Sequence, residues 1–432
     1  MNQALFDYIK ASPTAYHATS HTAALLRNAG YTELPECTEW KLEAGKGYFV
    51  TRNGSSLIAF RVPASREFKS FMMTAAHDDT PGFKVKENAE LPDGNYLRLS
   101  VERYGGVQYP SWLDRPLSIA GRVIIRTEGG LASRLVDFGE TCAFMPNVAL
   151  HMMNTNSGMS YNPAVDMVPL FGEAADAGSF RSRICELLGV SSEDILTTDL
   201  FVYCNQAGME WSHFISAPRL DDLQCAFATL TAFVESGKAD VRSDTCPVFC
   251  IFDNEEVGSQ TKQGAASTFL YDTLIRIGAA MDLSAGDIYR KLASSFMVSC
   301  DNAHAVHPNH PEFKDGNHTV YMNKGIVIKY NASQKYTTDA ISAAIFGLIC
   351  ERAGVPVQRF ANRADMGGGS TLGNIANTQV SLNTIDIGLP QLAMHSAYET
   401  AGAQDTEMMV RALTLFFNST IQASGDGVYT LL

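Results

Sequence analysis

From Pro218 onward, short apolar runs alternate with longer segments whose apolar residues recur at helical spacing. The runs predict strands, at Pro247–Phe252, Phe296–Cys300, Ile326–Tyr330 and Gln379–Ile387. The longer segments predict helices, at Leu220–Glu235, Ala265–Ile277, Thr338–Ala353 and Thr406–Ala423. Strands that alternate with helices form a sheet covered by helices on both faces. We therefore expect an α/β fold with a mixed sheet, and we expect ligands at the carboxyl ends of its strands.

The middle of the chain has a different pattern, with many short β-like segments separated by glycine-rich turns. Strands are expected there at Tyr96–Val101, Ile119–Arg126, Val168–Phe171 and Asp199–Tyr203, with a helix near Ser179–Leu188. Before it, the first thirty residues predict a helical layer, and short apolar runs at Tyr48–Val50, Leu57–Val62 and Phe71–Ala76 predict strands. We expect a discontinuous domain of residues 1–87 and 211–432, interrupted by a β-rich inserted second domain at 88–210.

The net charge excludes several partners. Lys and Arg number 33 against 46 Asp and Glu, a formal charge of −13. We therefore expect no binding to nucleic acid and none to an anionic membrane surface. No apolar run approaches the roughly 20 residues of a membrane-spanning helix, and the N-terminus does not resemble a signal peptide. With nine cysteines and no CxxC pair, the expectation is a soluble cytoplasmic protein with reduced thiols.

Five short segments rich in His, Asp and Glu follow apolar runs or begin a helix, and they begin at His77, Asp221, Asp253, Asp301 and His395. The strongest is Asp253-Asn-Glu-Glu256, because adjacent glutamates after a buried strand are costly unless their charge is compensated. Adjacent side chains point to different sides. One carboxylate can then bind a metal while the other faces the reacting water.

Each segment also has a simpler interpretation. The segment from His77 to Asp79 is rich in turn formers, and Asp221 could merely cap a helix. A lone histidine such as His395 is more often structural, and not all three histidines between 304 and 310 can be ligands. Other known sequence motifs are absent. The chain has no P-loop and no HExxH motif, and the Gly367–Gly369 run does not match a dinucleotide-binding fingerprint.

Taken together, the segments supply two histidines and three carboxylates, His77, Asp221, Glu256, Asp301 and His395. Imidazole and carboxylate without thiolate suit zinc, cobalt or manganese in a hydrolytic site. One aspartate bridging two ions would leave two further ligands for each, and such a pair can activate a water. A free glutamate beside a ligand is a natural general base for that water. In an extended segment, Asp79 could hold the other nitrogen of His77.

The chain resembles the aspartyl aminopeptidases, including vacuolar aminopeptidase I, which are co-catalytic zinc exopeptidases. The likeness covers nearly the whole chain. The segments that carry it are Ala11-Ser-Pro-Thr-Ala-Tyr-His17, Tyr104-Gly-Gly106, Trp112-Leu-Asp-Arg115, Ile119-Ala-Gly-Arg-Val123, Ala217-Pro-Arg-Leu-Asp221, Asp253-Asn-Glu-Glu-Val-Gly258, Ala303-His-Ala-Val-His-Pro308 and Pro390-Gln-Leu-Ala-Met-His-Ser396.

The resemblance implies a role for each candidate residue. His77, Asp221 and Asp301 correspond to the ligands of one zinc, and Asp221, Glu256 and His395 to those of the other. Glu255 corresponds to the general base and Asp79 to the aspartate that orients His77. Three residues, His304, Lys329 and Tyr336, correspond to substrate contacts. His151 corresponds to a histidine that reaches a neighbouring subunit's active site.

The resemblance also implies an assembly and a substrate. The family forms a tetrahedral shell of twelve subunits built from dimers, with the β-rich insertion at the dimer contacts. We expect a peptide substrate with an acidic N-terminal residue. The family commonly has Asn where this chain has Asp222, and a different run where it has the Gly367–Gly369 loop. In sites of this type the bond after the bridging aspartate is often cis, so we expect a cis bond between Asp221 and Asp222.

Two alternatives remain at this point. A metal-dependent carboxypeptidase or amide deacylase could share the fold and the ligands. A non-catalytic shell or scaffold protein could keep the fold alone, although Glu255 and all five ligands are present.

Overall fold

The computed structural model describes residues 1–152, 160–238 and 244–432. Its largest feature is a nine-stranded mixed sheet in the order β1-β2-β3-β13-β4-β14-β18-β16-β17. The strands are β1 (Thr32–Glu33), β2 (Gly47–Arg52), β3 (Ser56–Arg61), β4 (Ser70–His77), β13 (Thr245–Phe252), β14 (Phe296–Cys300), β16 (Ile326–Tyr330), β17 (Val357–Ala361) and β18 (Asn383–Gly388). The four central strands β13, β4, β14 and β18 run parallel to one another.

Helices cover both faces of this sheet, as the alternation predicts. On one face, α1, α2, α4, α7 and α9 pack against the sheet around Phe233 and Phe249, and on the other α5, α6 and α8 pack around Phe71 and Phe269. The helices are α1 (Asn2–Lys10), α2 (Ala15–Asn28), α4 (Leu220–Ser236), α5 (Phe269–Ala280), α6 (Ala285–Ala293), α7 (Ala340–Arg352), α8 (Leu372–Ala376) and α9 (Asp405–Phe417). Neighbouring residues of a strand point to opposite faces of the sheet, and helices bury both of these faces. Side chains on both sides of the central strands are therefore apolar, so these strands appear in the sequence as continuous apolar runs.

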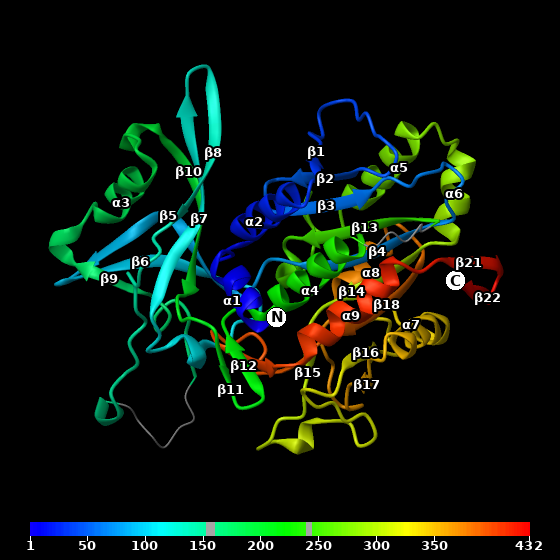
Figure 1. Ribbon diagram of the computed structural model, residues 1–432. Coiled ribbons are helices and arrows are strands. Elements are labelled where there is room, and N and C mark those ends of the chain that lie inside the picture. Colours follow the sequence, from blue (N-terminus) through cyan, green and yellow to red (C-terminus); the bar gives the residue numbers. More distant parts are fainter. Residues whose placement is uncertain (153–159, 239–243) are drawn as a thin grey trace.

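A second sheet has six strands, all antiparallel, in the order β8-β7-β10-β5-β6-β9. Its elements are β5 (Gly82–Asp93), β6 (Tyr96–Tyr104), β7 (Leu117–Thr127), β8 (Gly130–Asp137), β9 (Leu170–Glu173), β10 (Ile195–Cys204) and the helix α3 (Ser179–Leu188). Figure 1 shows this sheet with α3 on the left, beside the nine-stranded sheet. Its strands lie between residues 82 and 204, against the 88–210 expected for the insertion. The division into two domains stays a prediction.

A five-stranded sheet in the order β11-β12-β20-β19-β15 carries segments from three distant parts of the chain. Its strands are β11 (Met209–Trp211), β12 (Phe214–Ala217), β15 (Ala303–His304), β19 (Pro390–Leu392) and β20 (Glu399–Gly402). It places the segments around Asp221, Asp301 and His395 next to one another, because each of them adjoins one of these strands.

The expected terminal helix Thr406–Ala423 is too long. Helix α9 ends at Phe417, and a hairpin of β21 (Ile421–Gly425) and β22 (Val428–Leu431) follows. The helix ends before the polar run Asn418–Thr420, because the side chains of Asn, Ser and Thr compete for main-chain hydrogen bonds. Asp426-Gly427 is a strong signal for the turn of a hairpin. Among the described residues, no helix is both long enough and apolar enough to cross a membrane.

Candidate metal centre

The candidate ligands converge at the carboxyl ends of the three adjacent parallel strands β13, β4 and β14. His77 is the last residue of β4, and Asp301 directly follows β14. Glu255 and Glu256 begin the 3₁₀ turn η5 (Glu255–Val257), just after β13. Parallel strands end at the same edge of a sheet, so segments far apart in sequence present their polar side chains together.

Asp221 lies at the centre of the cluster and faces a different imidazole with each carboxylate oxygen. Its Oδ1 is 3.5 Å from Nε2 of His77, and its Oδ2 is 3.5 Å from Nε2 of His395. The Nε2 atom of His395 is also 3.5 Å from Oε2 of Glu256. Asp221 Oδ1 is buried and has no hydrogen-bond partner among the described residues. An isolated buried carboxylate oxygen is costly, and a cation between these groups would remove that cost.

The possible ligand atoms form three overlapping groups, and within each group all atoms lie within 4.8 Å of one another. The first group contains His77, Asp221, Asp222 and Asp301, the second contains His77, Glu255 and Glu256, and the third contains Asp221, Glu256 and His395. Asp221 belongs to the first and the third, as a bridging ligand would. The donor set of imidazole and carboxylate fits a divalent metal ion in a hydrolytic site. The expected cis peptide bond between Asp221 and Asp222 is present.

The two histidines are oriented by main-chain oxygens. Nδ1 of His77 lies 3.0 Å from the carbonyl oxygen of Asp79 and 3.4 Å from its Oδ1. Nδ1 of His395 lies 2.7 Å from the carbonyl oxygen of Gly106, which belongs to the segment after β6. A hydrogen bond from Nδ1–H to each carbonyl leaves Nε2 of each ring free to bind a metal.

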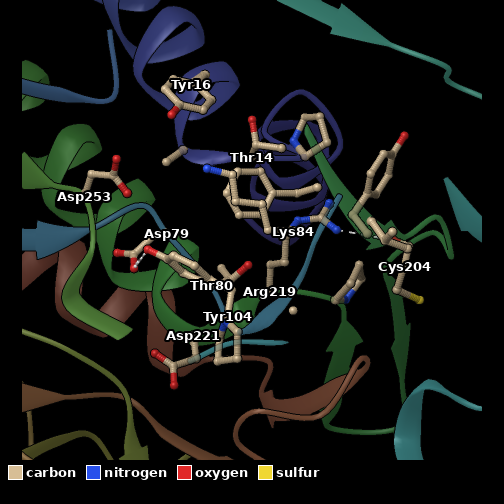
Figure 2. Close-up of a pocket in the computed structure, with 18 of the residues that line it drawn as sticks. Thr14, Tyr16, Asp79, Thr80, Lys84, Tyr104, Cys204, Arg219, Asp221 and Asp253 are labelled. Atoms are coloured by element: carbon tan, nitrogen blue, oxygen red, sulfur yellow. Dashed lines mark hydrogen bonds between the residues drawn. The ribbon is translucent and has the colours of Figure 1, made fainter. Parts of the chain in front are cut away.

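The carboxylate of Asp79 holds the loop that carries the two glutamates. Its Oδ1 accepts the N–H of Glu255 at 3.0 Å, and its Oδ2 accepts the N–H of Glu256 at 3.1 Å. The hydroxyl of Tyr104 also donates to Oδ2, at 2.7 Å, and Figure 2 shows these two side chains together. Sequence reasoning assigned Asp79 to His77 alone and missed Tyr104 and Gly106.

Burial dominates the electrostatics of the cluster. It raises the pKa of Glu255 to about 8, with the carboxylates of Asp301, Asp79 and Asp221 adding to the effect and His77 opposing it. Burial would lower the pKa of His77, but the neighbouring carboxylates of Asp221 and Asp79 outweigh it and hold this pKa well above its usual value. The group is therefore a set of crowded carboxylates with few positive partners, as expected for a site that binds cations.

The candidate substrate residues His304, Lys329 and Tyr336 line a cavity of 430 Å³ together with the cluster. The ammonium of Lys329 is buried and lies 3.7 Å from Oδ2 of Asp301. Burial alone would lower the pKa of Lys329, but Asp301 and Tyr336 raise it above its usual value, so the side chain stays charged. The loop at Gly369 also lines this cavity.

His151 lies apart from the cluster. It is exposed in the short turn η2 (Leu150–Met152), between β8 and β9, and is not among the residues that line the cavity. The chain therefore brings together every candidate site residue except this one.

A second cavity, of 260 Å³, is lined by Asp79 and Asp221 together with residues of β5, β7 and β10 of the six-stranded sheet. Figure 2 shows its lining, which includes Tyr16 from α2, Tyr104 from the end of β6 and Arg219 from the turn before α4. Asp221 thus lines both cavities, and the six-stranded sheet forms part of the surroundings of the candidate metal centre.

Comparisons with known proteins agree over nearly the whole chain. A family model described as "Aminopeptidase I zinc metalloprotease (M18)" matches residues 8–417. A "Probable M18 family aminopeptidase 2" from Clostridium novyi (strain NT) is 40% identical over 427 residues, covering 96% of this chain and 98% of that protein. Its counterpart from Pseudomonas aeruginosa (strain UCBPP-PA14) is 41% identical over 433 residues, covering 97% and 98%.

Solved structures agree as well. The cryo-EM structure of the Ape4 and Nbr1 complex contains a chain with a TM-score of 0.93 and 32% identity, covering 96% of this chain and 85% of that one. The S. cerevisiae mApe1 dodecamer matches with a TM-score of 0.84 and 28% identity, covering 96% and 95%.

Proposed function

This chain belongs to the M18 family of metallo-aminopeptidases, and from that premise we propose that it releases acidic N-terminal residues from peptides with two zinc ions. The observation that carries the two-ion proposal is Asp221, whose two carboxylate oxygens each face a different imidazole. Asp301 would complete the ligands of one ion with His77 and Asp221. Glu256 would complete those of the other with Asp221 and His395. Cobalt or manganese would fit the same donors.

Bound there, the pair of ions would supply a water of lowered pKa and an electrophile for the scissile carbonyl. Glu255 takes the proton from the attacking water and returns it to the leaving amine, so it ends the cycle as it began. Asp79 acts on this step through the main chain, because it holds the N–H groups of Glu255 and Glu256. It also keeps His77 oriented through its carbonyl oxygen.

The preference for acidic N-terminal residues is supported by Lys329. It is a buried, charged ammonium that lines the cavity holding the metal cluster. A carboxylate on the substrate's first side chain would be a second negative partner for this ammonium, beside Asp301. We propose that His304 and Tyr336, which line the same cavity, contact the substrate beside it.

The assembly is proposed to be a dodecamer built from dimers, by analogy with the similar S. cerevisiae mApe1 dodecamer. The inserted residues 88–210 are proposed as a dimerisation and lid domain. Strongly exposed apolar side chains lie there, among them Met152, Leu131 and Val165, and such surfaces mark interaction sites. All nine cysteines lie within the described residues and are free thiols, which supports a cytoplasmic location.

The test is a panel of chromogenic amides with Asp, Glu, Leu or Lys as the N-terminal residue, assayed with and without a chelator. We expect the aspartyl and glutamyl amides to be cleaved fastest, with all activity lost on chelation. In Lys329→Met, kcat/KM for the acidic amides should fall roughly 10- to 100-fold towards that for the leucyl amide, the effect of losing one buried charge pair. Fast cleavage of N-acetylated peptides would contradict the aminopeptidase mechanism. If Lys329→Met lowered kcat/KM equally for all four amides, the assignment of Lys329 to the acidic side chain would be contradicted.

A further inference from the structure

Glu399 carries a buried carboxylate that has no part in the reaction described above. It is the first residue of β20, lies opposite Ala217 of β12, and is only 2% exposed. It lines the 260 Å³ cavity and is not among the residues that line the 430 Å³ cavity with the substrate residues. It therefore lines a different cavity from the proposed substrate residues, and Asp221 lines both cavities.

The two oxygens of this carboxylate hold two different segments of main chain. Oε2 accepts the N–H of Asp221 at 3.0 Å, and Oε1 accepts the N–H of His395 at 2.8 Å. Both of these residues are candidate ligands of the same ion, with Oδ2 of Asp221 and Nε2 of His395 3.5 Å apart. One side chain thus sets the distance between two ligands that are far apart in the sequence.

The conformation of His395 depends on such support. Its φ is +67°, in the left-handed region that non-glycine residues rarely adopt. Strained residues of this kind persist only where the surroundings hold them. Three hydrogen bonds hold it: its N–H donates to Glu399, its Nδ1 is bonded to the carbonyl of Gly106, and its carbonyl oxygen accepts the N–H of Gln108 at 3.2 Å.

We propose that Glu399 is a positioning residue for the second metal ion, the one held by Asp221, Glu256 and His395. This inference rests on the proposed two-ion site. Glu399 touches neither the ion nor the substrate, and it acts by fixing the main chain of two ligands relative to each other. The first ion shares Asp221 and so also depends on Glu399. It depends on it less, because its other two ligands, His77 and Asp301, make no hydrogen bond to Glu399 among the described residues.

The test is Glu399→Gln, which keeps the size of the side chain but places an NH₂ group against one of the two N–H donors. Metal content per chain is measured by elemental analysis during titration with zinc, and the cobalt-loaded protein is followed by absorption spectroscopy. Removing a contact that orients a ligand costs about 10- to 100-fold in metal affinity. We expect that loss for the second ion, with a smaller loss for the first, which shares only Asp221 with it, and a changed cobalt spectrum.

Asp405→Asn is the matched control. Asp405 is also a fully buried carboxylate that accepts two main-chain N–H groups, those of Asn323 and Gly325, but it lines neither cavity. It should change the free energy of unfolding and leave two ions bound. If both variants lost metal equally, the effect of Glu399→Gln would be explained by general destabilisation of the fold. That result would overturn the inference.

The wild-type protein separates this inference from the proposed function. If it binds fewer than two ions, the two-ion site is wrong and the inference falls with it. If it binds two and Glu399→Gln binds two with unchanged affinity, only the role of Glu399 is wrong. If Glu399→Gln does not fold, hydrogen exchange on metal-free wild type decides. The amides of Asp221 and His395 should both exchange slowly, and fast exchange of either would overturn the inference.

Discussion

At the scale of single residues, the main chain orients the candidate ligands as much as side chains do. Carbonyl oxygens of Asp79 and Gly106 orient the two imidazoles, and main-chain N–H groups bind the carboxylates of Asp79 and Glu399. These contacts depend on where the backbone runs. A substitution at the residue that supplies a carbonyl oxygen does not remove that oxygen. The contact is therefore tested better by substituting the side chain that bonds to it.

Glu255→Gln should separate the chemical step from metal binding. The amide keeps the shape of the side chain but cannot take a proton, so kcat should fall roughly 10²- to 10⁴-fold. KM and the metal content should change little, since neither depends on the proton. Stopped assays with elemental analysis of the same sample provide both readouts. A variant that loses metal instead would mean that Glu255 is a ligand.

The sequence predicted the polar residues of the centre but not what holds them. His77, Asp221, Glu256, Asp301 and His395 could be predicted because each adjoins an apolar strand or begins a helix, and strand ends of an α/β sheet meet. The roles of Glu399, Tyr104 and Gly106 could not, because they depend on hydrogen bonds between segments far apart in sequence. No local pattern reports such a contact. The resemblance did include Tyr104-Gly-Gly106, without a reason for it.

At the scale of elements, the end of β6 reaches the metal centre from the six-stranded sheet. Gly105 has a φ of +71°, and a Cβ on it would lie 3.0 Å from Cβ of Glu256. A side chain there would be strained and would press on a candidate ligand. The segment can approach this closely only because it is glycine, and it brings Tyr104 to Asp79 and the Gly106 carbonyl to His395.

Tyr104→Phe should weaken this contact between the sheets. The hydroxyl donates to Asp79 and accepts from Nδ2 of Asn254. Losing a hydrogen bond to a charged group costs about 1.5–3 kcal/mol of unfolding free energy, which urea unfolding would measure. kcat should also fall, because Glu255 is less well held. The control is Tyr109→Phe, because the hydroxyl of Tyr109 contacts only the exposed side chain of Arg103 among the described side-chain hydrogen bonds. Equal effects of the two substitutions would contradict the role of Tyr104.

Helix α2 should make stability depend on pH through His17. Burial, with Arg219 adding and Asp137 opposing, lowers the pKa of His17 to about 4, against about 6.5 in the unfolded chain. Between these values the unfolded state binds the proton and the folded state does not. Stability is therefore full above pH 6.5 and falls as the pH drops towards 4, by up to roughly 3 kcal/mol.

A His17→Gln variant cannot take up this proton, so urea unfolding from pH 7 to pH 4.5 should show a shallower decline than in wild type. His307→Asn, at an exposed histidine, should keep the wild-type decline. A His17 variant with an unchanged decline would contradict the lowered pKa of His17, because the folded and unfolded states would then bind this proton equally.

Helices and strands were predicted correctly where a single pattern of apolar residues runs through the whole element. The central strands β13, β14 and β16 were expected within two residues of their observed bounds, because they are apolar on both faces. The C-terminal hairpin was missed, since the apolar residues of α9 and of β21 adjoin and a pattern alone does not separate them. Short strands such as β19 and β20 gave no periodic signal at all.

At the scale of the whole molecule, His151 is the one candidate residue that the chain does not bring to its own site. Mixing His151→Ala with Glu255→Gln tests whether it acts in a neighbouring subunit. Some mixed pairs would combine an intact His151 with an intact Glu255, so activity should return in verified hetero-oligomers. His310→Ala, at another exposed histidine, replaces His151→Ala in the control and should be active on its own. Hetero-oligomers without restored activity would contradict a shared site.

The candidate ligands are spread along the chain from His77 to His395. On the proposed assignment, a nascent chain that stops before His395 would lack a ligand, and one that stops before Glu399 would lack the contact that places it. Peptidase activity would then begin only after residue 399 has been synthesised, so the growing chain would need no separate inhibitor before that point.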